Sequence, residues 1–183
     1  MERPIIQVAS IAEVPSELLH GLLPAIEARF PGRVARLATQ GLQRPDYAYA
    51  STRRQYRSEP ILERLGHLRG DAERLLGVAD LDLFAAGLNF IFGQAQVGGQ
   101  AAVMALARLR PEFWGQPPDP PRLLERAIKE AIHELGHTYG LGHCADPTCV
   151  MRFSNRLEET DSKRDRFCRA HAAQLTRALR STA

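Results

Sequence analysis

The spacing of apolar and polar positions changes several times along the first 110 residues. Short apolar runs typical of strands cover residues 4–11, 33–38, 76–84, 88–95 and 101–107. Helical spacing covers residues 15–30, where Ser16 is the expected N-cap and Pro24 a kink or break, and residues 58–67. Because strands and helices are interleaved, the pattern predicts an α/β fold.

A further helix is expected at the end of the proline-rich stretch of residues 111–121. Asp119 suits the N-cap position and Pro120 suits the first helical position. One apolar face is formed by residues at steps of four and three, namely Leu124, Ile128, Ala131 and Leu135. Glu125 precedes Lys129 by four residues, so we expect the opposite face to be exposed.

The composition narrows the class of protein. Of the 183 residues, 44% are hydrophobic and 25% are charged, which is an ordinary balance for a soluble globular protein. No apolar run approaches the length of a membrane span, and the run near the N-terminus is too short for a signal-peptide core. We therefore expect a single cytoplasmic domain over residues 1–183, monomeric and without a membrane partner. Its sheet-and-helix part would cover about residues 1–140, and a C-terminal part residues 141–183.

The formal net charge of +3 comes almost entirely from arginine, because Lys129 and Lys163 are the two lysines of the chain. The arginines are scattered, apart from the small cluster of Arg53, Arg54 and Arg57. A protein that binds nucleic acid is expected to gather its basic residues on one element. Nucleic acid is therefore not an expected partner.

The string HELGHTYGLGH, which begins at His133, carries a metal-binding pattern. His133 and His137 are four residues apart on the expected helix, so both imidazoles can face one metal ion. Glu134 is rotated by about 100° from His133, which lets its carboxylate reach a water on the metal without being a ligand. Gly140 can take a positive φ that ends the helix, and His143 can return as the third ligand. Three protein ligands leave one position open, the arrangement of a catalytic zinc site.

The chemistry expected of this site is hydrolysis of a peptide bond. Zinc lowers the pKa of its water from about 15.7 to roughly 7, and it polarises the carbonyl under attack. Glu134 would accept the proton of that water as general base and later pass it to the leaving amine. The motif has five fixed positions. On the order of 1 in 10,000 chains of this length would match them by chance.

All three cysteines lie in the last third of the chain, beside the histidine motif. Cys144 and Cys149 form one close pair, eighteen residues follow, and Cys168 and His171 form the second pair. An odd number of cysteines argues against a closed disulfide framework, whereas four ligands would close the coordination sphere of a structural zinc ion. The alternative is that these are ordinary thiols and a surface histidine.

These two clusters resemble the archaemetzincins, a family in the metzincin clan of zinc metallopeptidases. In that family a cysteine directly follows the third histidine, as Cys144 does here, and a methionine lies two residues after the second cysteine, as Met151 does. GVADLDLF and the segments at 92–95 and 106–109 are also similar, and the resemblance covers roughly residues 45–171.

The resemblance implies a zincin (metzincin-like) fold, with a mixed twisted sheet and the active-site helix at the floor of a cleft. It implies two zinc ions, a peptide or protein substrate, and Met151 in a Met-turn beneath the catalytic metal. It also implies an edge strand along which the substrate binds, and residues 101–107 are our candidate for that strand. The chain departs from the family at His171, where a fourth cysteine is usual, and the stretch from Met151 to Cys168 is one residue shorter than usual.

Other residues are expected to have ordinary structural roles. His20 and His67 should face solvent, Tyr139 should pack, and Asp161 and Lys163 should lie in a solvated charged loop. Three other functions stay open: a non-catalytic binding protein stabilised by zinc, a nucleic-acid module built on the cysteine cluster, and a hydrolase of non-peptide amides. Endopeptidase and aminopeptidase action are not distinguished by the sequence.

Overall fold

The computed structural model describes residues 3–181 and has five α-helices and eight strands. The strands are β1 (Ile5–Ile11), β2 (Val34–Leu37), β3 (Tyr49–Ala50), β4 (Gln55–Arg57), β5 (Arg74–Ala79), β6 (Leu83–Phe84), β7 (Gly93–Ala95) and β8 (Ala101–Ala105). The α-helices are α1 (Ser16–Arg29), α2 (Ser58–Leu68), α3 (Pro120–Thr138), α4 (Leu157–Ser162) and α5 (Arg169–Ser181). The predicted α/β class is confirmed.

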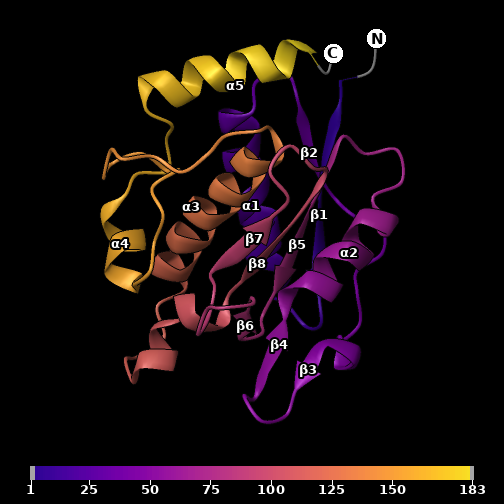
Figure 1. The fold of residues 1–183 in the computed structure, drawn as a ribbon, viewed down its shortest axis with the longest axis vertical. Helices are drawn as coiled ribbons and strands as arrows, with labels where there is room; N and C mark the ends of the chain where they lie inside the picture. Colours follow the sequence, from indigo (N-terminus) through magenta and orange to yellow (C-terminus); the bar gives the residue numbers. More distant parts are fainter. Residues whose placement is uncertain (1–2, 182–183) are drawn as a thin grey trace.

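The main sheet has five strands in the order β2-β1-β5-β8-β7. Four of them are parallel, and β7 pairs antiparallel with β8 at one edge. Helices α1 and α3 pack on one face and α2 on the other (Figure 1). Side chains therefore alternate between two cores: Val78 and Met104 join α1 and α3, whereas Ala79 and Val103 join α2. Burial on both faces explains why β5 and β8 are apolar along their length.

A smaller sheet of β3, β4 and β6 lies beside the carboxyl end of β5 (Figure 1). Strand β4 pairs parallel with β6, and β3 pairs antiparallel with β4. The C-terminal helix α5 lies across the end of the main sheet that is opposite the smaller sheet (Figure 1). Its Leu175 and Leu179 are buried in the same core as α1 and α3. The guanidinium of Arg33 donates to Leu179 O at 2.9 Å, which ties α5 to the turn before β2. No helix within residues 3–181 is long and apolar enough to cross a membrane.

Several predicted boundaries were wrong. Pro15, not Ser16, occupies the N-cap position of α1, and α1 continues through Pro24 without a break. The predicted strand at 76–84 is divided into β5 and β6, and most of the segment at 88–95 is loop. These errors arise because an apolar run shows burial but does not show where backbone pairing stops.

Candidate active site

Helix α3 positions the histidine motif, and its limits are those expected from its caps. The Asp119 carboxylate accepts a hydrogen bond from the Arg122 backbone N–H at 3.0 Å, and Pro120 starts the helix. The helix ends at Thr138, after which Gly140 takes a φ of 81° and the chain turns away. That turn brings His143 back toward the two histidines of the helix.

The three histidines converge as predicted. One ring nitrogen from each of His133, His137 and His143 lies within 4.8 Å of the others. His133 Nδ1 donates to Val150 O at 2.8 Å and His137 Nδ1 donates to Leu141 O at 2.7 Å, so in the neutral imidazoles both Nε2 atoms are unprotonated. Those Nε2 atoms are 3.1 Å apart. Two lone pairs facing each other at this distance are unfavourable unless a cation lies between them, so the donor set fits a metal ion.

Burial also favours the form of histidine that binds metal. Desolvation lowers the pKa of His133 and of His137, and it lowers that of the more exposed His143 as well. Neutral imidazole is the metal-binding form. The three rings are therefore prepared for coordination at neutral pH.

Glu134 lies beside this cluster and is 4% exposed. Burial raises the pKa of its carboxyl group, and nearby Glu130 raises it further, whereas Lys163 lowers it. Gly93 of the edge strand β7 packs directly on this side chain, because a Cβ atom at residue 93 would lie 2.5 Å from Glu134 Oε1. The carboxylate is thus held between α3 and β7.

A cavity of about 240 Å³ opens next to these groups. Its lining comes from the loop before β7, from α3 and from the segment after Met151, namely Gly87, Leu88, Asn89, Phe90, Ile91, Phe92, Gly93, Glu130, His133, Glu134, Phe153, Ser154 and Asn155. His133 of the histidine cluster and Glu134 therefore lie at the wall of a cavity that can receive part of a ligand.

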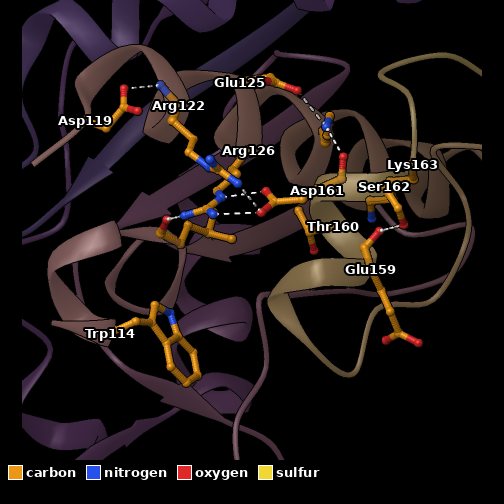
Figure 2. A network of polar contacts seen from close by, with 12 residues as sticks. Trp114, Asp119, Arg122, Glu125, Arg126, Glu159, Thr160, Asp161, Ser162 and Lys163 are labelled. Atoms are coloured by element: carbon orange, nitrogen blue, oxygen red, sulfur yellow. Dashed lines mark hydrogen bonds and ion pairs between the residues drawn. The ribbon is translucent and has the colours of Figure 1, made fainter. Parts of the chain in front are cut away.

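The charged residues after this segment are not a solvated loop, so that expectation was wrong. Lys163 is fully buried and forms an ion pair with buried Glu130 at 2.9 Å, while Thr160 Oγ1 donates to the same carboxylate at 3.0 Å. Asp161 accepts two hydrogen bonds from Arg126, at 2.6 and 2.7 Å, and one from Arg122 at 2.9 Å (Figure 2). These contacts fix α4 against α3.

One signal in the sequence could have located Glu130. Glu130 precedes His133 by three residues and Glu134 by four, which places it on their face of the helix. Lys129 was expected on an exposed face; it does pair with Glu125 at 2.8 Å, but its own side chain is 5% exposed. It donates to Asp161 O at 3.0 Å, so this face of α3 packs against α4.

The second predicted cluster is also brought together. One ligand atom from each of Cys144, Cys149, Cys168 and His171 lies within 4.8 Å of the others. Cys144 Sγ and Cys168 Sγ are 3.8 Å apart, which is too far for a disulfide. Zinc–sulfur bonds of about 2.3 Å at tetrahedral angles place two sulfur atoms about 3.8 Å apart. Cys168 Sγ and His171 Nδ1 are 3.3 Å apart, so the histidine occupies the place of a fourth ligand.

One short segment joins the two clusters. The Cys144 backbone N–H donates to Met151 O at 2.9 Å, and Val150 O accepts from His133. Met151 is buried against α3, where a Cβ atom at Gly136 would lie 2.6 Å from its sulfur. Residues 149–151 therefore contact both candidate metal centres.

Comparison with known proteins agrees with this geometry. The model of peptidase family M54 matches residues 22–177. The chain belongs to peptidase family M54, the archaemetzincins. It is 44% identical to an archaemetzincin of Pyrococcus furiosus, over 97% of this chain and 95% of that protein.

Solved structures agree with the M54 assignment. The crystal structure of an archaemetzincin from Methanopyrus kandleri is 37% identical, with a TM-score of 0.85 and coverage of 97% of this chain and 96% of that chain. That of a zinc-dependent peptidase from Methanocorpusculum labreanum is 28% identical, with a TM-score of 0.84 and coverage of 93% and 99%.

This M54 chain is a zinc metallopeptidase with a metzincin-like fold, as the resemblance implied. Its described residues provide two zinc sites, one of three histidines and one of three cysteines and a histidine. The expectations for three further residues hold: His20 and His67 are exposed, and Tyr139 packs on Phe30 with ring centroids 5.3 Å apart.

Proposed function

We propose that this peptidase hydrolyses peptide bonds with Glu134 as general base and with His133, His137 and His143 as the ligands of the catalytic zinc. The observation that carries the proposal is the convergence of the two unprotonated Nε2 atoms beside the buried carboxylate. Bound zinc would lower the pKa of a water molecule and polarise the scissile carbonyl.

The residues of the chain supply the remaining steps. Glu134 Oε1 and Oε2 can take a proton from the attacking water and return it to the leaving amine. Glu134 is positioned for this transfer, because its side chain is held between α3 and Gly93 of β7. Val150 O and Leu141 O hold the imidazoles of His133 and His137 in one orientation.

We propose a structural role for the second zinc, bound by Cys144, Cys149, Cys168 and His171. Four protein ligands leave no position for substrate. The site would fix the backbone that carries His143 and Met151, because Cys144 adjoins the one and Cys149 lies two residues from the other. The close packing of Met151 on Gly136 supports a Met-turn beneath the catalytic centre.

Residues 101–107 were the wrong candidate for the strand that binds substrate. Residues 101–107 include β8, which pairs with β5 on one side and with β7 on the other, so it has no free edge. Strand β7 is the edge strand, and its Gly93 contacts Glu134. We propose that an extended peptide pairs with β7, whose outward backbone groups would supply affinity.

The competing functions account for less of the site. A non-catalytic zinc protein has no need of a buried carboxylate beside the metal ligands, and a non-peptide amide would need no open strand edge. The cysteine cluster lies against the active site, which leaves it unsuited to a separate nucleic-acid module. We propose that the protein is a cytoplasmic monomer that binds neither nucleic acid nor membrane.

Incubation of the zinc-loaded protein with a mixed peptide library, followed by mass spectrometry, tests the proposal. Glu134→Ala should retain its metal, as measured by elemental analysis, and its cleavage rate should fall by a factor of about 10² to 10⁴. Glu63→Ala changes an exposed glutamate of α2 and should cleave like the parent. Equal cleavage by Glu134→Ala and the parent would disprove the assigned mechanism. The positions of the cut bonds distinguish endopeptidase from aminopeptidase action.

A further inference from the structure

The cavity beside Glu134 has aromatic walls. Phe90, Phe92 and Phe153 all line it, and the first two pack edge to face with ring centroids 5.2 Å apart. The guanidinium of Arg108 lies 4.4 Å from the ring centroid of Phe90 and is itself held by two hydrogen bonds to Asp82. The part of the wall formed by Phe90 and Phe92 is therefore fixed before a ligand arrives, and it favours a flat ring.

The floor of the same cavity is polar. Lys163 Nζ and Thr160 Oγ1 both contact Glu130 Oε1, at 2.9 and 3.0 Å. Both contacts are made to Oε1, so the second carboxylate oxygen of Glu130, a residue that lines the cavity, can accept a further hydrogen bond. Because Lys163 already balances the charge of Glu130, a second cation would gain little there. A neutral hydrogen-bond donor would gain a charged acceptor.

Ser154 supplies a second polar group at the cavity. Its Oγ atom is buried and has no hydrogen-bond partner among the described residues. A buried hydroxyl without a partner is uncommon, because it gives up the hydrogen bonds it had with water. A polar ligand atom at this position would provide the missing partner.

We propose that this cavity selects substrates that carry a tyrosine side chain next to the bond that is cut. The phenol ring would lie among Phe90, Phe92 and Phe153. The phenol hydroxyl would donate to Glu130 Oε2 and accept from Ser154 Oγ. The inference rests on the proposed peptidase function and adds a substrate class to it.

Other side chains fit this cavity less well. Phenylalanine fills the aromatic walls but brings no polar atom to Glu130 and leaves Ser154 Oγ without a partner, a mismatch that discriminates more strongly than lost apolar contact does. Lysine would bring its ammonium group toward that of Lys163. Glutamine can form the hydrogen bonds but has no ring.

A series of alanine-based peptides, each with one central tyrosine, phenylalanine, glutamine or lysine, tests the inference. The values of kcat/KM for the zinc-loaded protein should favour tyrosine over phenylalanine by about tenfold, the effect of one hydrogen bond to a charged group. Glutamine and lysine peptides should be cut more slowly still. Cleavage of the phenylalanine peptide as fast as the tyrosine peptide, or fastest cleavage of the lysine peptide, would overturn the assignment.

Serine variants locate the selectivity within the cavity. Ser154→Ala should reduce the ratio of kcat/KM for the tyrosine and phenylalanine peptides by about threefold to tenfold, because the tyrosine hydroxyl loses a donor. Ser162→Ala removes an exposed hydroxyl that donates to Glu159 O on α4, and it should leave this ratio unchanged. An unchanged ratio in a folded Ser154→Ala variant would refute the role of Ser154.

Binding to the zinc-loaded Glu134→Gln variant, measured by fluorescence anisotropy with labelled peptides, separates this inference from the proposed function. The tyrosine peptide should bind more tightly than the phenylalanine peptide without being cut. If the parent protein binds with that preference but hydrolyses no peptide, the proposed function fails and the cavity assignment holds. If peptides are hydrolysed but neither binding nor cleavage favours tyrosine, the cavity assignment fails and the proposed function holds.

Discussion

At the scale of single residues, the close packing of Gly93 on Glu134 gives a direct test of the active site. Gly93→Ala would place a methyl group 2.5 Å from Glu134 Oε1, so the carboxylate must move away from its position. We expect kcat to fall by about tenfold to a hundredfold, since a small displacement of a general base removes much of its effect.

The matched control for this change is Gly66→Ala. Gly66 lies within α2, and an added Cβ there meets no atom within 4 Å. Activity should be unchanged and the melting temperature equal or slightly higher, because alanine favours a helix over glycine. Full activity of a folded Gly93→Ala variant would mean that Glu134 is not held by this contact.

The two lysines of the chain differ in what their loss would leave behind. Lys163→Met would leave the Glu130 carboxylate buried without its cation, and we expect a loss of about 3–5 kcal/mol in the free energy of unfolding. Lys129→Met should cost less, about 1–2 kcal/mol, because its partner Glu125 is exposed and the other contact it loses is one hydrogen bond to Asp161 O. Urea titrations measure both losses.

A second substitution tests the cause of the Lys163 effect. Adding Glu130→Gln to Lys163→Met removes the unpaired charge, so the double variant should recover part of the lost stability. A double variant that loses the sum of the two single losses would show that the ion pair is not the source.

Local sequence reasoning explains which residues were found and which were missed. His133, Glu134, His137 and His143 follow from spacing within one helix and its exit, so eleven residues of sequence contain the signal. The partner of Glu130 is Lys163, which no local pattern connects to it. The cost of burying a charge is visible only after the chain has folded.

At the scale of elements, the position of β7 at the edge of the sheet predicts which backbone groups meet a peptide. Ala105 N–H donates to Phe92 O at 2.7 Å, and bonding alternates along an antiparallel pair, so the N–H groups of Gly93 and Ala95 face away from β8. Ala95→Pro removes one outward donor. We expect KM to rise several-fold, with little change in melting temperature.

Val97→Pro is the matched proline control. Gly99 N–H donates to Gln96 O at 2.8 Å, and Gly98 has a φ of 72°, so Val97 occupies the second position of a turn in which proline is common. This variant should keep the KM of the parent. Unchanged peptide kinetics in a folded Ala95→Pro variant would exclude β7 as the substrate strand.

The elements differ in how well the sequence predicted them. Helix α3 was placed correctly because its caps and its apolar spacing agree over nineteen residues. Strands β3, β4 and β6 have two or three residues each, too few to show a period. The order of strands depends on pairing between distant segments, which is why β8 was wrongly expected to bind substrate.

At the scale of the whole molecule, the cysteine cluster should connect stability to catalysis. His171→Ala should lower the melting temperature and kcat together, because the second zinc fixes the segment that carries His143 and Met151. The loss of stability could reach several kcal/mol, since metal binding contributes directly to folding in such sites (about 10 kcal/mol or more in isolated zinc modules). His171→Cys should preserve both properties, because four cysteines also bind zinc.

Elemental analysis should find two zinc ions in the parent protein and in His171→Cys, and about one in His171→Ala. A strong chelator should remove the catalytic ion first, because that site has an open coordination position. One zinc per parent chain with full activity would exclude the second site. If His171→Ala has normal activity and stability, the second site does not support the catalytic site.

The contact between Gly93 and Glu134 also constrains how this protein can change by descent. A lineage that keeps the glutamate as an efficient general base is expected to keep glycine on β7, since every other side chain begins with a Cβ atom that would displace the carboxylate. A lineage that replaces the glutamate by a smaller residue loses that constraint, and position 93 becomes free to drift. A larger residue at position 93 is therefore expected mainly in descendants whose hydrolysis is weakened or lost, even where all three histidines persist.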